Sequence, residues 1–376
     1  MRPICSSHKT QIPMKMKKKH EVDRLTNLVR DKVDAHQASL AMDIGAGQGY
    51  LTYMLAISQV PMVAVDSDSH QTCGSKARLL KNSPEIGDKV LHLTQKLDTD
   101  SLVGLVDRID RGAVPEVDKM ISSNTSRSSY VVTGLHACGD LSSAMVESFI
   151  RDQRIRALVG VGCCYNLLTE GDLSHPNCIF GFPLSSKVKS WFEEHDFGFG
   201  PRTRGLACQV SIEAVSLTQL RHMLEGTYYR SLLNYVFSDL KLDGPRTDEG
   251  HLRIKRLPHE AYDSFVLYAQ HALSKVGMSG AVDEATLRRY DEQNRHMLQA
   301  MQLIYMTRAL LGPIIENVIL VDRALRLQES ASAAGTDVEV ALLNLFDAES
   351  SPRNMVLVAE KPRLCRESTD AELQSA

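Results

Sequence analysis

The glycine-rich segment DIGAGQG at residues 43–49 follows a short apolar run and precedes a helical pattern. Its three glycines let the backbone turn tightly and approach a ligand closely, and the helix after them offers free N–H groups at its start. A dinucleotide fingerprint would place a further glycine at position 50, where the chain has Tyr50. Asp43 fits poorly beside a pyrophosphate, but its carboxylate suits a cationic ligand such as the ammonium of a methionine moiety.

A second acid, Asp66, ends the next apolar run, 17 residues after the last glycine of the loop. A carboxylate in this position can accept both ribose hydroxyls of a nucleoside. The loop and the two acids together point to S-adenosyl-L-methionine as the cofactor. Asp98 follows the third predicted strand and is the candidate partner of the adenine amino group, with a solvated loop residue as the alternative. The predicted cofactor contacts are Asp43, Gly45, Ala46, Gly47, Gly49, Asp66, Asp98 and His136.

Two polar clusters end the fourth and fifth predicted strands: HACGD at residues 136–140 and CCYN at residues 163–166. Because open α/β sheets bind ligands at the carboxyl ends of their strands, both clusters should face the methyl group that is transferred. His136 could remove a proton from the nucleophile and Asp140 could orient that histidine. Tyr165 and Asn166 could hold a polar edge of the substrate. The candidate catalytic residues are His136, Asp140, Cys163, Cys164, Tyr165 and Asn166.

The thiols of Cys138, Cys163 and Cys164 leave two further kinds of chemistry open. A thiolate could attack a pyrimidine ring and make a ring carbon nucleophilic. The three thiols could also bind a metal ion together with His136. Cysteines at strand ends, however, are usually small buried hydrophobic residues, so we expect no metal site.

Alternating strands and helices are expected to position these residues. Apolar residues recur with helical spacing from residue 21 onward, and strand patterns then alternate with helical ones. This order predicts βαβ units with a parallel sheet. The expected strands cover residues 39–44, 61–65, 90–94, 130–135, 157–161, 338–346 and 354–360, and the expected helices include residues 51–57, 70–80, 102–109 and 142–151. The last two strands are separated by turn residues, as in a hairpin.

Composition excludes several classes of protein. The 376 residues are 43% hydrophobic and 24% charged, as in a globular protein with a sizeable core, and the net charge of −3 gives no global attraction to nucleic acid. The eight cysteines form no CxxC pair, which argues against a zinc ribbon or a disulfide framework. We find no signal peptide and no apolar stretch of about 18 residues, so we expect an intracellular protein, cytoplasmic or nuclear, that does not contact a membrane.

Several segments together resemble the methyltransferase-like 25 group, which includes proteins labelled as ribosomal RNA adenine dimethylase domain-containing. The motifs are KKKHEV at 17–22, DIGAGQG at 43–49, GLHACGDL at 134–141, GCCYNLL at 162–168, GFPLS at 181–185, ENVILVDR at 316–323 and SPRN at 351–354. The HACGD and CCY pair is also similar to the catalytic domain of a tRNA 2′-O-methyltransferase family that acts at the acceptor stem, which has CC-H-H where this chain has CCY-N. The N-P-P-[FYW] motif of adenine amino methylation is absent.

The resemblance implies a seven-stranded Rossmann-like methyltransferase sheet, mostly parallel, with a C-terminal antiparallel hairpin and a helical insertion. It implies an S-adenosylmethionine-dependent methyltransferase whose leading substrate is RNA, either rRNA or tRNA; the alternatives are a protein or small molecule as substrate, or a non-catalytic binding module, with an unidentified protein partner also open. The resemblance also places a substrate-binding segment near the active site, formed by Lys17, Lys18, Lys19, His20 and Glu21, of which His20 and Glu21 would cap the cofactor pocket.

An RNA-binding surface would combine residues 15–19 with Arg202, Arg204, Arg253, Lys255 and Arg256. The expected organisation is a basic N-terminal arm (1–20), the first part of the core (21–186), a mostly helical insertion (187–330), strands that complete the sheet (331–363) and a polar tail (364–376).

Overall fold

The computed structural model describes residues 12–121, 129–171, 181–209, 216–247, 250, 252–254, 256–351 and 353–363. The chain divides into two compact units. Unit 1 is formed by Met1–Gln209 and Gly312–Ala376, and unit 2 by Val210–Leu311. Each unit has its own hydrophobic core, so each is described by itself.

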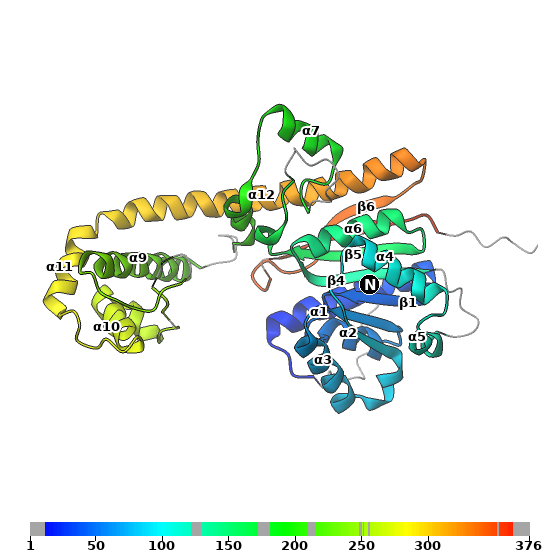
Figure 1. Ribbon diagram of the computed structural model, residues 1–376, viewed down its shortest axis with the longest axis horizontal. Helices are drawn as coiled ribbons and strands as arrows, with labels where there is room; N and C mark the ends of the chain where they lie inside the picture. Colours follow the sequence, from blue (N-terminus) through cyan, green and yellow to red (C-terminus); the bar gives the residue numbers. More distant parts are fainter. Residues whose placement is uncertain are drawn as a thin grey trace, which may run out of the picture. The chain divides into compact units, whose positions relative to one another are not determined.

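Unit 1 is built on one seven-stranded sheet, in the order β3-β2-β1-β4-β5-β7-β6 (Figure 1). The strands are β1 (Leu40–Ile44), β2 (Met62–Asp66), β3 (Val90–Thr94), β4 (Tyr130–Cys138), β5 (Ile155–Cys163), β6 (Glu339–Asn344) and β7 (Met355–Glu360). The first five pair in parallel, and β7 runs antiparallel to both of its neighbours. The predicted Rossmann-like methyltransferase sheet with its C-terminal hairpin is thereby confirmed.

Helices cover both faces of this sheet (Figure 1). One face packs against α1 (Met16–His36), α2 (Tyr50–Ile57) and α3 (Ser69–Asn82), and the other against α4 (Thr99–Asp110), α5 (Pro115–Met120) and α6 (Asp140–Arg151). The inner strands are buried on both sides, which explains their continuous apolar sequences. Because β1 connects to β2 on one side and pairs with β4 on the other, the chain reverses its direction of winding there, and ligands bind at such a point.

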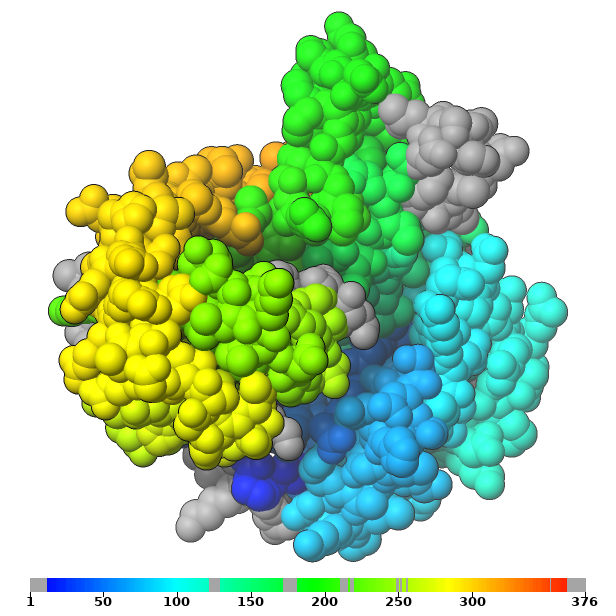
Figure 2. Space-filling view, turned by 60° about the vertical axis from the view of Figure 1, so that its left-hand side comes forward, coloured from blue at the N-terminus to red at the C-terminus, as the bar shows by residue number. Residues whose placement is uncertain are grey.

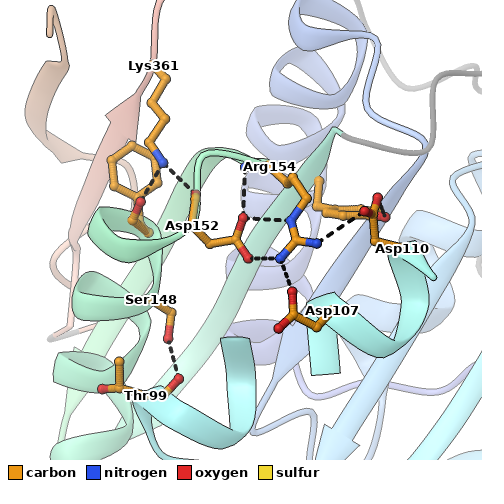
Figure 3. A network of polar contacts seen from close by, with 9 residues as sticks. Thr99, Asp107, Asp110, Ser148, Asp152, Arg154 and Lys361 are labelled. Carbon is orange, nitrogen blue, oxygen red and sulfur yellow. Dashed lines mark hydrogen bonds and ion pairs between the residues drawn. The ribbon is translucent and has the colours of Figure 1, made fainter. Parts of the chain in front are cut away.

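An arginine at the start of β5 ties the second face together, at the end of the sheet remote from the glycine loop (Figure 3). The Arg154 guanidinium contacts Asp152 at 2.6 Å, Asp107 at 2.5 Å and Asp110 at 3.2 Å. Its hydrogen bond to Asp107, together with its charge, holds the pKa of that carboxyl below the usual range. Nearby, the buried Lys361 ammonium donates to the backbone oxygens of Phe149 and Asp152, both at 2.6 Å. These contacts connect α4, α6, β5 and the chain after β7.

The insertion is shorter than the sequence predicted. We expected it to cover residues 187–330, whereas unit 2 covers Val210–Leu311. The flanking segments belong to unit 1 because α7 (Ser186–Glu194), α8 (Gly200–Arg204) and the second half of α12 (Met297–Ala334) share its buried contacts. The expected basic arm is also shorter, since α1 already begins at Met16. Residues 1–11 and 364–376 lie outside the described part of the chain.

Unit 2 is helical, as expected, and packs around its own aromatic core. It comprises α9 (Leu217–Asp239), α10 (Phe265–Lys275), α11 (Glu284–Asn294) and the first part of α12. Buried tyrosine and phenylalanine rings fill its centre, and its residues form one continuous body, yellow-green to yellow in Figure 2.

The described residues of both units also include short 3-10 helices: η1 (Pro84–Lys89), η2 (Tyr165–Leu167), η3 (Gly205–Cys208) and η5 (His259–Tyr262). The strand-like run at 209–215 falls almost wholly outside the described residues.

Helix α12 is long and apolar enough to cross a membrane by length and composition, with an 18-residue window of mean hydropathy 1.4. The expectation that no segment reaches this level was therefore wrong. One such helix is weak evidence, because core helices of globular proteins meet the same criteria. Only 28% of that window is buried, whereas Asp322 and Arg323, in the unit 1 half of α12, are buried among polar partners.

Asp322 fastens α12 to the segment before α7. Its carboxylate accepts hydrogen bonds from the Leu184 N–H at 2.7 Å, the Ser185 N–H at 2.9 Å and the Ser185 hydroxyl at 2.7 Å. We expect Asp322→Ala to lower the free energy of unfolding by about 2–4 kcal/mol, because three buried donors lose their acceptor. Urea unfolding measures the change.

Asp31→Ala, at an exposed position of α1, serves as the control and should leave the urea midpoint unchanged. Equal midpoints for Asp322→Ala and Asp31→Ala would contradict the anchoring role.

Candidate active site

The glycine loop after β1 has the backbone conformation that its sequence predicts. Gly45, Gly47 and Gly49 have φ angles of 72°, 53° and 70°, which side chains with a Cβ rarely adopt. At Gly49 an added Cβ would also lie 1.8 Å from the Ser75 hydroxyl oxygen. The N–H groups of Gly45 and Ala46 donate to the Val65 carbonyl at 2.9 and 3.1 Å, which fixes the loop to the end of β2.

Asp66 lies beside this loop, at the end of β2. One carboxylate oxygen accepts from the Gly47 N–H at 2.8 Å and the other from the Asp68 N–H at 2.9 Å. Asp66 lines a cavity of about 500 Å³, within the size range of small-molecule sites. The same cavity is lined by Gly45, Gln95, Lys96, Leu97, His136, Cys138 and Asp140.

Asp43 lies deeper than the rest of the loop. It is 1% exposed, and its carboxylate accepts a 2.6 Å hydrogen bond from the Thr52 hydroxyl. Burial raises its pKa to about 6, so a cation at this carboxylate would relieve part of the cost of its charge. Asp43 lines a second cavity of about 240 Å³, which shares Gly45 and His136 with the first. We therefore regard the two cavities as lobes of one cleft.

Asp98 has a role in the fold that the sequence analysis did not foresee. It is the N-cap of α4, where its carboxylate accepts from the Ser101 N–H at 2.8 Å and from the Ser101 hydroxyl at 2.6 Å. These bonds lower the pKa of Asp98. It is exposed and lines a neighbouring pocket rather than the main cavity. Its contact with adenine stays a prediction, and Gln95 and Leu97 are better placed along the main cavity.

His136 pairs with an acid, but with a different one from the acid that we expected. Its Nε2 lies 3.3 Å from a carboxylate oxygen of Glu21, on α1. Asp140 instead accepts a 2.7 Å hydrogen bond from the Thr169 N–H. The expectation that Asp140 orients His136 was therefore wrong. His136 also has a φ of 68°, an uncommon conformation that is concentrated at functional sites.

Glu21 is fully buried and surrounded by donors. The Ser351 hydroxyl donates to it at 2.7 Å. Burial raises the pKa of Glu21, but the hydrogen bonds from His136 and Ser351 and the charges of His136 and Lys18 outweigh burial and lower it to about 2. Glu21 is therefore ionised at neutral pH and can stabilise a positive charge on His136.

The basic residues before Glu21 begin helix α1. The ammonium groups of Lys17 and Lys18 lie 3.8 and 3.6 Å from the Glu21 carboxylate. Lys18 lines the smaller lobe of the cleft, whereas Lys19 is exposed. His20 accepts a hydrogen bond from the Asp347 N–H at 3.0 Å and packs edge-on against Phe346. Of the two residues expected to cap the pocket, only Glu21 contacts a residue that lines it.

The side chain of Tyr165 is buried in the protein interior and does not face substrate. It is 1% exposed, and its hydroxyl donates to Glu316 at 3.0 Å. Burial raises its pKa. Arg353 completes the group with a 3.3 Å contact to Glu316. The expectation that Tyr165 holds substrate was therefore wrong, whereas the neighbouring Asn166 is exposed and available to do so.

Three thiols meet where β4 and β5 end. The Sγ atom of Cys138 lies 3.2 Å from that of Cys163 and 3.3 Å from that of Cys164, and the last two are 3.7 Å apart. Hydrogen bonding from Cys163 lowers the pKa of the Cys138 thiol, whereas hydrogen bonding to Cys138 and burial raise that of Cys163. Cys138 lines the cleft, whereas Cys163 and Cys164, which we expected to face the transferred methyl group, are not among the described residues that line either lobe.

One residue of the expected RNA-binding surface is buried, and others are exposed as predicted. Arg202 is exposed, but Arg204 is 3% exposed, contacts Glu170 and donates to the carbonyls of Tyr165 and Leu168. Arg204 therefore holds the loop after β5 and was wrongly assigned to the surface. Arg253 and Arg256 are exposed in unit 2, and Lys255 lies outside the described residues.

Comparison with known proteins agrees with this arrangement. Residues 17–171 match the model of a family described as "Methyltransferase domain". The chain carries a methyltransferase domain. Its match begins with the lysines of α1 and ends after the CCYN cluster, so the domain includes both the glycine loop and the His136–Glu21 pair.

The resemblance to the methyltransferase-like 25 group is confirmed. The chain is 30% identical over 237 residues to a probable methyltransferase-like protein 25 from Mus musculus, and 29% identical over 239 residues to that from Homo sapiens. Each match covers 61% of this chain and 37% of the relative, so this chain corresponds to well under half of the relatives' length.

Among solved structures, the CcbJ methyltransferase from Streptomyces caelestis matches 40% of this chain and 56% of that chain. The sequence identity is 10% and the TM-score 0.24. The fold assignment rests on the strand order instead.

The sequence analysis did not identify several residues that shape the site. Ser351, Glu316, Arg353 and Arg323 come from the last quarter of unit 1, where the sequence analysis assigned no site residue. The only sequence signal for them was their place in the motifs ENVILVDR and SPRN. Glu316, Ser351 and Arg323 have partners over 100 residues earlier in the chain, at Tyr165, Glu21 and Ser142, and Arg353 in turn contacts Glu316.

Glu21 gives a pH-dependent test of the site. Its folded-state pKa of about 2 lies below the ordinary 4.5, so its contribution to stability is complete above pH 4.5 and disappears as the pH falls through about 2. We expect Glu21→Gln to lower the free energy of unfolding by about 2–3 kcal/mol at pH 7, and the deficit to shrink between about pH 4.5 and 2. Urea unfolding across this pH range measures it.

The control is Glu85→Gln, at an exposed position. A Glu21→Gln deficit that is the same at pH 3 as at pH 7 would show that the carboxylate's charge is not the stabilising feature.

Proposed function

We propose that the methyltransferase domain of this protein binds S-adenosyl-L-methionine and transfers its methyl group to RNA. The observation that carries the proposal is the buried, ionised Glu21 beside His136, at the edge of a cleft that the glycine loop and Asp66 also line. A fold that had lost its reaction would need neither a strained histidine nor a carboxylate buried to hold it.

The residues of the cleft fit this cofactor. Asp66 lies at the strand end where a carboxylate binds ribose hydroxyls, and Gln95 and Leu97 form the adjoining wall of the cavity, against which a base can pack. The smaller lobe offers Asp43 for the ammonium group. The cofactor supplies a methyl group on a positively charged sulfur, which needs no activation beyond correct placement.

The side chains around the cleft then have to orient the nucleophile and remove its proton. His136 lines both lobes, so it can reach a hydroxyl or amine that enters the cleft. His136 would accept the proton that the nucleophile loses as that nucleophile bonds to the methyl carbon, while the carbon–sulfur bond breaks and S-adenosylhomocysteine leaves. Glu21 stabilises the resulting imidazolium and fixes the orientation of the ring. Asn166, exposed at the end of β5, can hydrogen-bond to the substrate.

Exposed cations near His136 support RNA as the substrate. Lys15, Lys17 and Lys19 are exposed at the start of α1, the helix that also supplies Glu21. Ammonium groups in this position can contact successive phosphates and guide a strand towards the cleft. The net charge of −3 makes this a local patch rather than a general attraction to nucleic acid.

Cofactor binding is tested by calorimetric titration with S-adenosylhomocysteine. We expect micromolar binding to the purified chain and a roughly 10–100-fold weaker affinity for Asp66→Asn, because the neutral amide replaces an acceptor of two ribose hydroxyls. Asparagine keeps the shape of the side chain and can still accept from the Gly47 N–H. Asp31→Asn is the matched surface control. A well-folded protein without measurable binding, or equal affinities of the two variants, would refute the cofactor site.

The proton-transfer role of His136 is tested by His136→Asn, because asparagine tolerates a positive φ. We expect S-adenosylhomocysteine affinity within about threefold of the unmodified protein and a methyl-transfer rate lower by about 10²–10⁴-fold. The assay follows labelled methyl groups from the cofactor into total cellular RNA and into protein, separated by nuclease digestion. His70→Asn, at an exposed position of α3, is the control.

The two parts of the proposal fail separately. Label that enters only protein would overturn RNA as the substrate and leave the transfer reaction intact. An unchanged rate in His136→Asn would overturn the assignment of His136 as the base.

A further inference from the structure

The three thiols at the ends of β4 and β5 form a cluster that the proposed methyl transfer does not use. Among the described residues, Cys138, Cys163 and Cys164 are a group whose ligand atoms are close enough to share one metal ion. Cys138 and Cys163 are direct neighbours in the parallel pairing of the two strands. Two of the three ligands are therefore held by the sheet itself, and Cys164 directly follows β5.

Its dimensions suit a thiophilic cation. Zinc binds thiolate sulfur at about 2.3 Å, and tetrahedral geometry then separates two sulfurs by about 3.8 Å. The observed separations of 3.2, 3.3 and 3.7 Å are near this value. A point about 2.3 Å from all three sulfurs lies only about 1 Å from the plane through them. Small side-chain rotations would bring the three sulfurs to the spacing of a tetrahedral site.

A buried cation beside the cluster provides the charge that thiolates need. Arg323 is 2% exposed, and its guanidinium lies so close to Gly162 that an added Cβ there would be 2.6 Å from Nη1. Gly162 directly precedes the two adjacent cysteines. The Nε–H of Arg323 has no hydrogen-bond acceptor among the described residues. Three thiolates with a divalent cation carry one net negative charge, which the guanidinium balances.

Both strand ends are also held in an uncommon backbone conformation. Cys164 has a φ of 49°, and His136, two residues before Cys138, a φ of 68°. Such conformations persist where the surrounding structure imposes them, and they are concentrated at functional sites. At Cys164 this conformation lets two adjacent residues present their sulfurs to the same point, which an extended strand with alternating side chains would prevent.

We propose that Cys138, Cys163 and Cys164 bind one soft divalent cation, with Zn²⁺ as the ion to test. Sulfur ligands select such ions over Mg²⁺ or Ca²⁺, which require oxygen ligands. Three protein ligands leave one tetrahedral position for water or a ligand in the cleft, which Cys138 lines. The sequence analysis expected no metal because cysteines at strand ends are usually small buried hydrophobic residues. In this structure the pairing of β4 with β5 brings Cys138 together with Cys163 and Cys164, although it lies far from them in the sequence.

The test is zinc analysis of the untagged full chain, dialysed after expression with added zinc. We expect about one Zn²⁺ per chain, and at least a tenfold lower zinc content in Cys138→Ser and in Cys163→Ser. Cys73→Ser, at an exposed position of α3, is the matched control and should keep the metal. Circular dichroism identifies any variant that fails to fold.

A second measurement keeps the test decisive if Cys163→Ser does not fold. Alkylation of the unsubstituted protein, followed by peptide mass spectrometry, should show these three thiols protected by zinc and released by a chelator, with Cys73 reactive throughout. Zinc-free protein that does not take up the ion would overturn the proposal. Retention of zinc by folded Cys138→Ser, or protection without metal by a disulfide, would do so as well. None of these readouts depends on methyl transfer or on the cofactor.

Discussion

The parallel pairing of β4 with β5 is the constraint on which the rest of the site depends. The pairing places Cys138 beside Cys163, so that the two polar clusters end at the same edge of the sheet. β1 pairs with β4 on its other side and brings the glycine loop to the same edge. A register shift of one residue would turn every side chain of a strand to the opposite face and separate these groups. Backbone hydrogen bonds between central strands, buried on both faces, make such a shift costly.

Buried charges hold the surroundings of this edge in place. Glu21, Asp322 and Arg323 are each at most 2% exposed, and Glu316 with Arg353 forms a further ion pair beneath Tyr165. Burying a charge is unfavourable unless its partners are in place, so each of these groups stabilises one arrangement of its neighbours strongly over alternatives. The groups come from α1, from the second half of α12 and from the segment before β7. The first helix and the last quarter of unit 1 thereby contribute to a site whose main motifs lie between residues 43 and 166.

The cleft and the thiol cluster share Cys138 but require different chemistry. The cleft joins backbone N–H groups and carboxylates, which suit a nucleoside with a cationic substituent. The cluster offers sulfur ligands beside a buried guanidinium, which suit a soft cation. Because the two lie at the ends of the same strands, a cation at the thiols would stiffen the edge to which His136 belongs. Unit 2 has its own core, and the residues of that core belong to neither site.

The sequence by itself determined the elements of the fold and the half of the site that is local in the chain. β3 begins and ends at the residues that the apolar pattern predicted, and the other strands agree to within a few residues. The DIGAGQG loop was predictable because its three glycines permit the backbone conformation that the loop requires. Asp66 was predictable because it ends a strand. These features depend on neighbours in the chain, so local physics fixes them.

Tertiary structure decided which groups meet. The sequence offered Asp140 as the partner of His136 because it is four residues away, yet the helix start at Asp140 directs that carboxylate to the Thr169 backbone. Glu21, 115 residues earlier, takes its place because α1 packs along one face of the sheet with its first turns beside the end of β4. Tyr165 was assigned to substrate and is buried on Glu316 instead. Such pairings depend on how the helices pack onto the sheet, which is set by contacts between segments far apart in the chain and not by the spacing of residues within one segment.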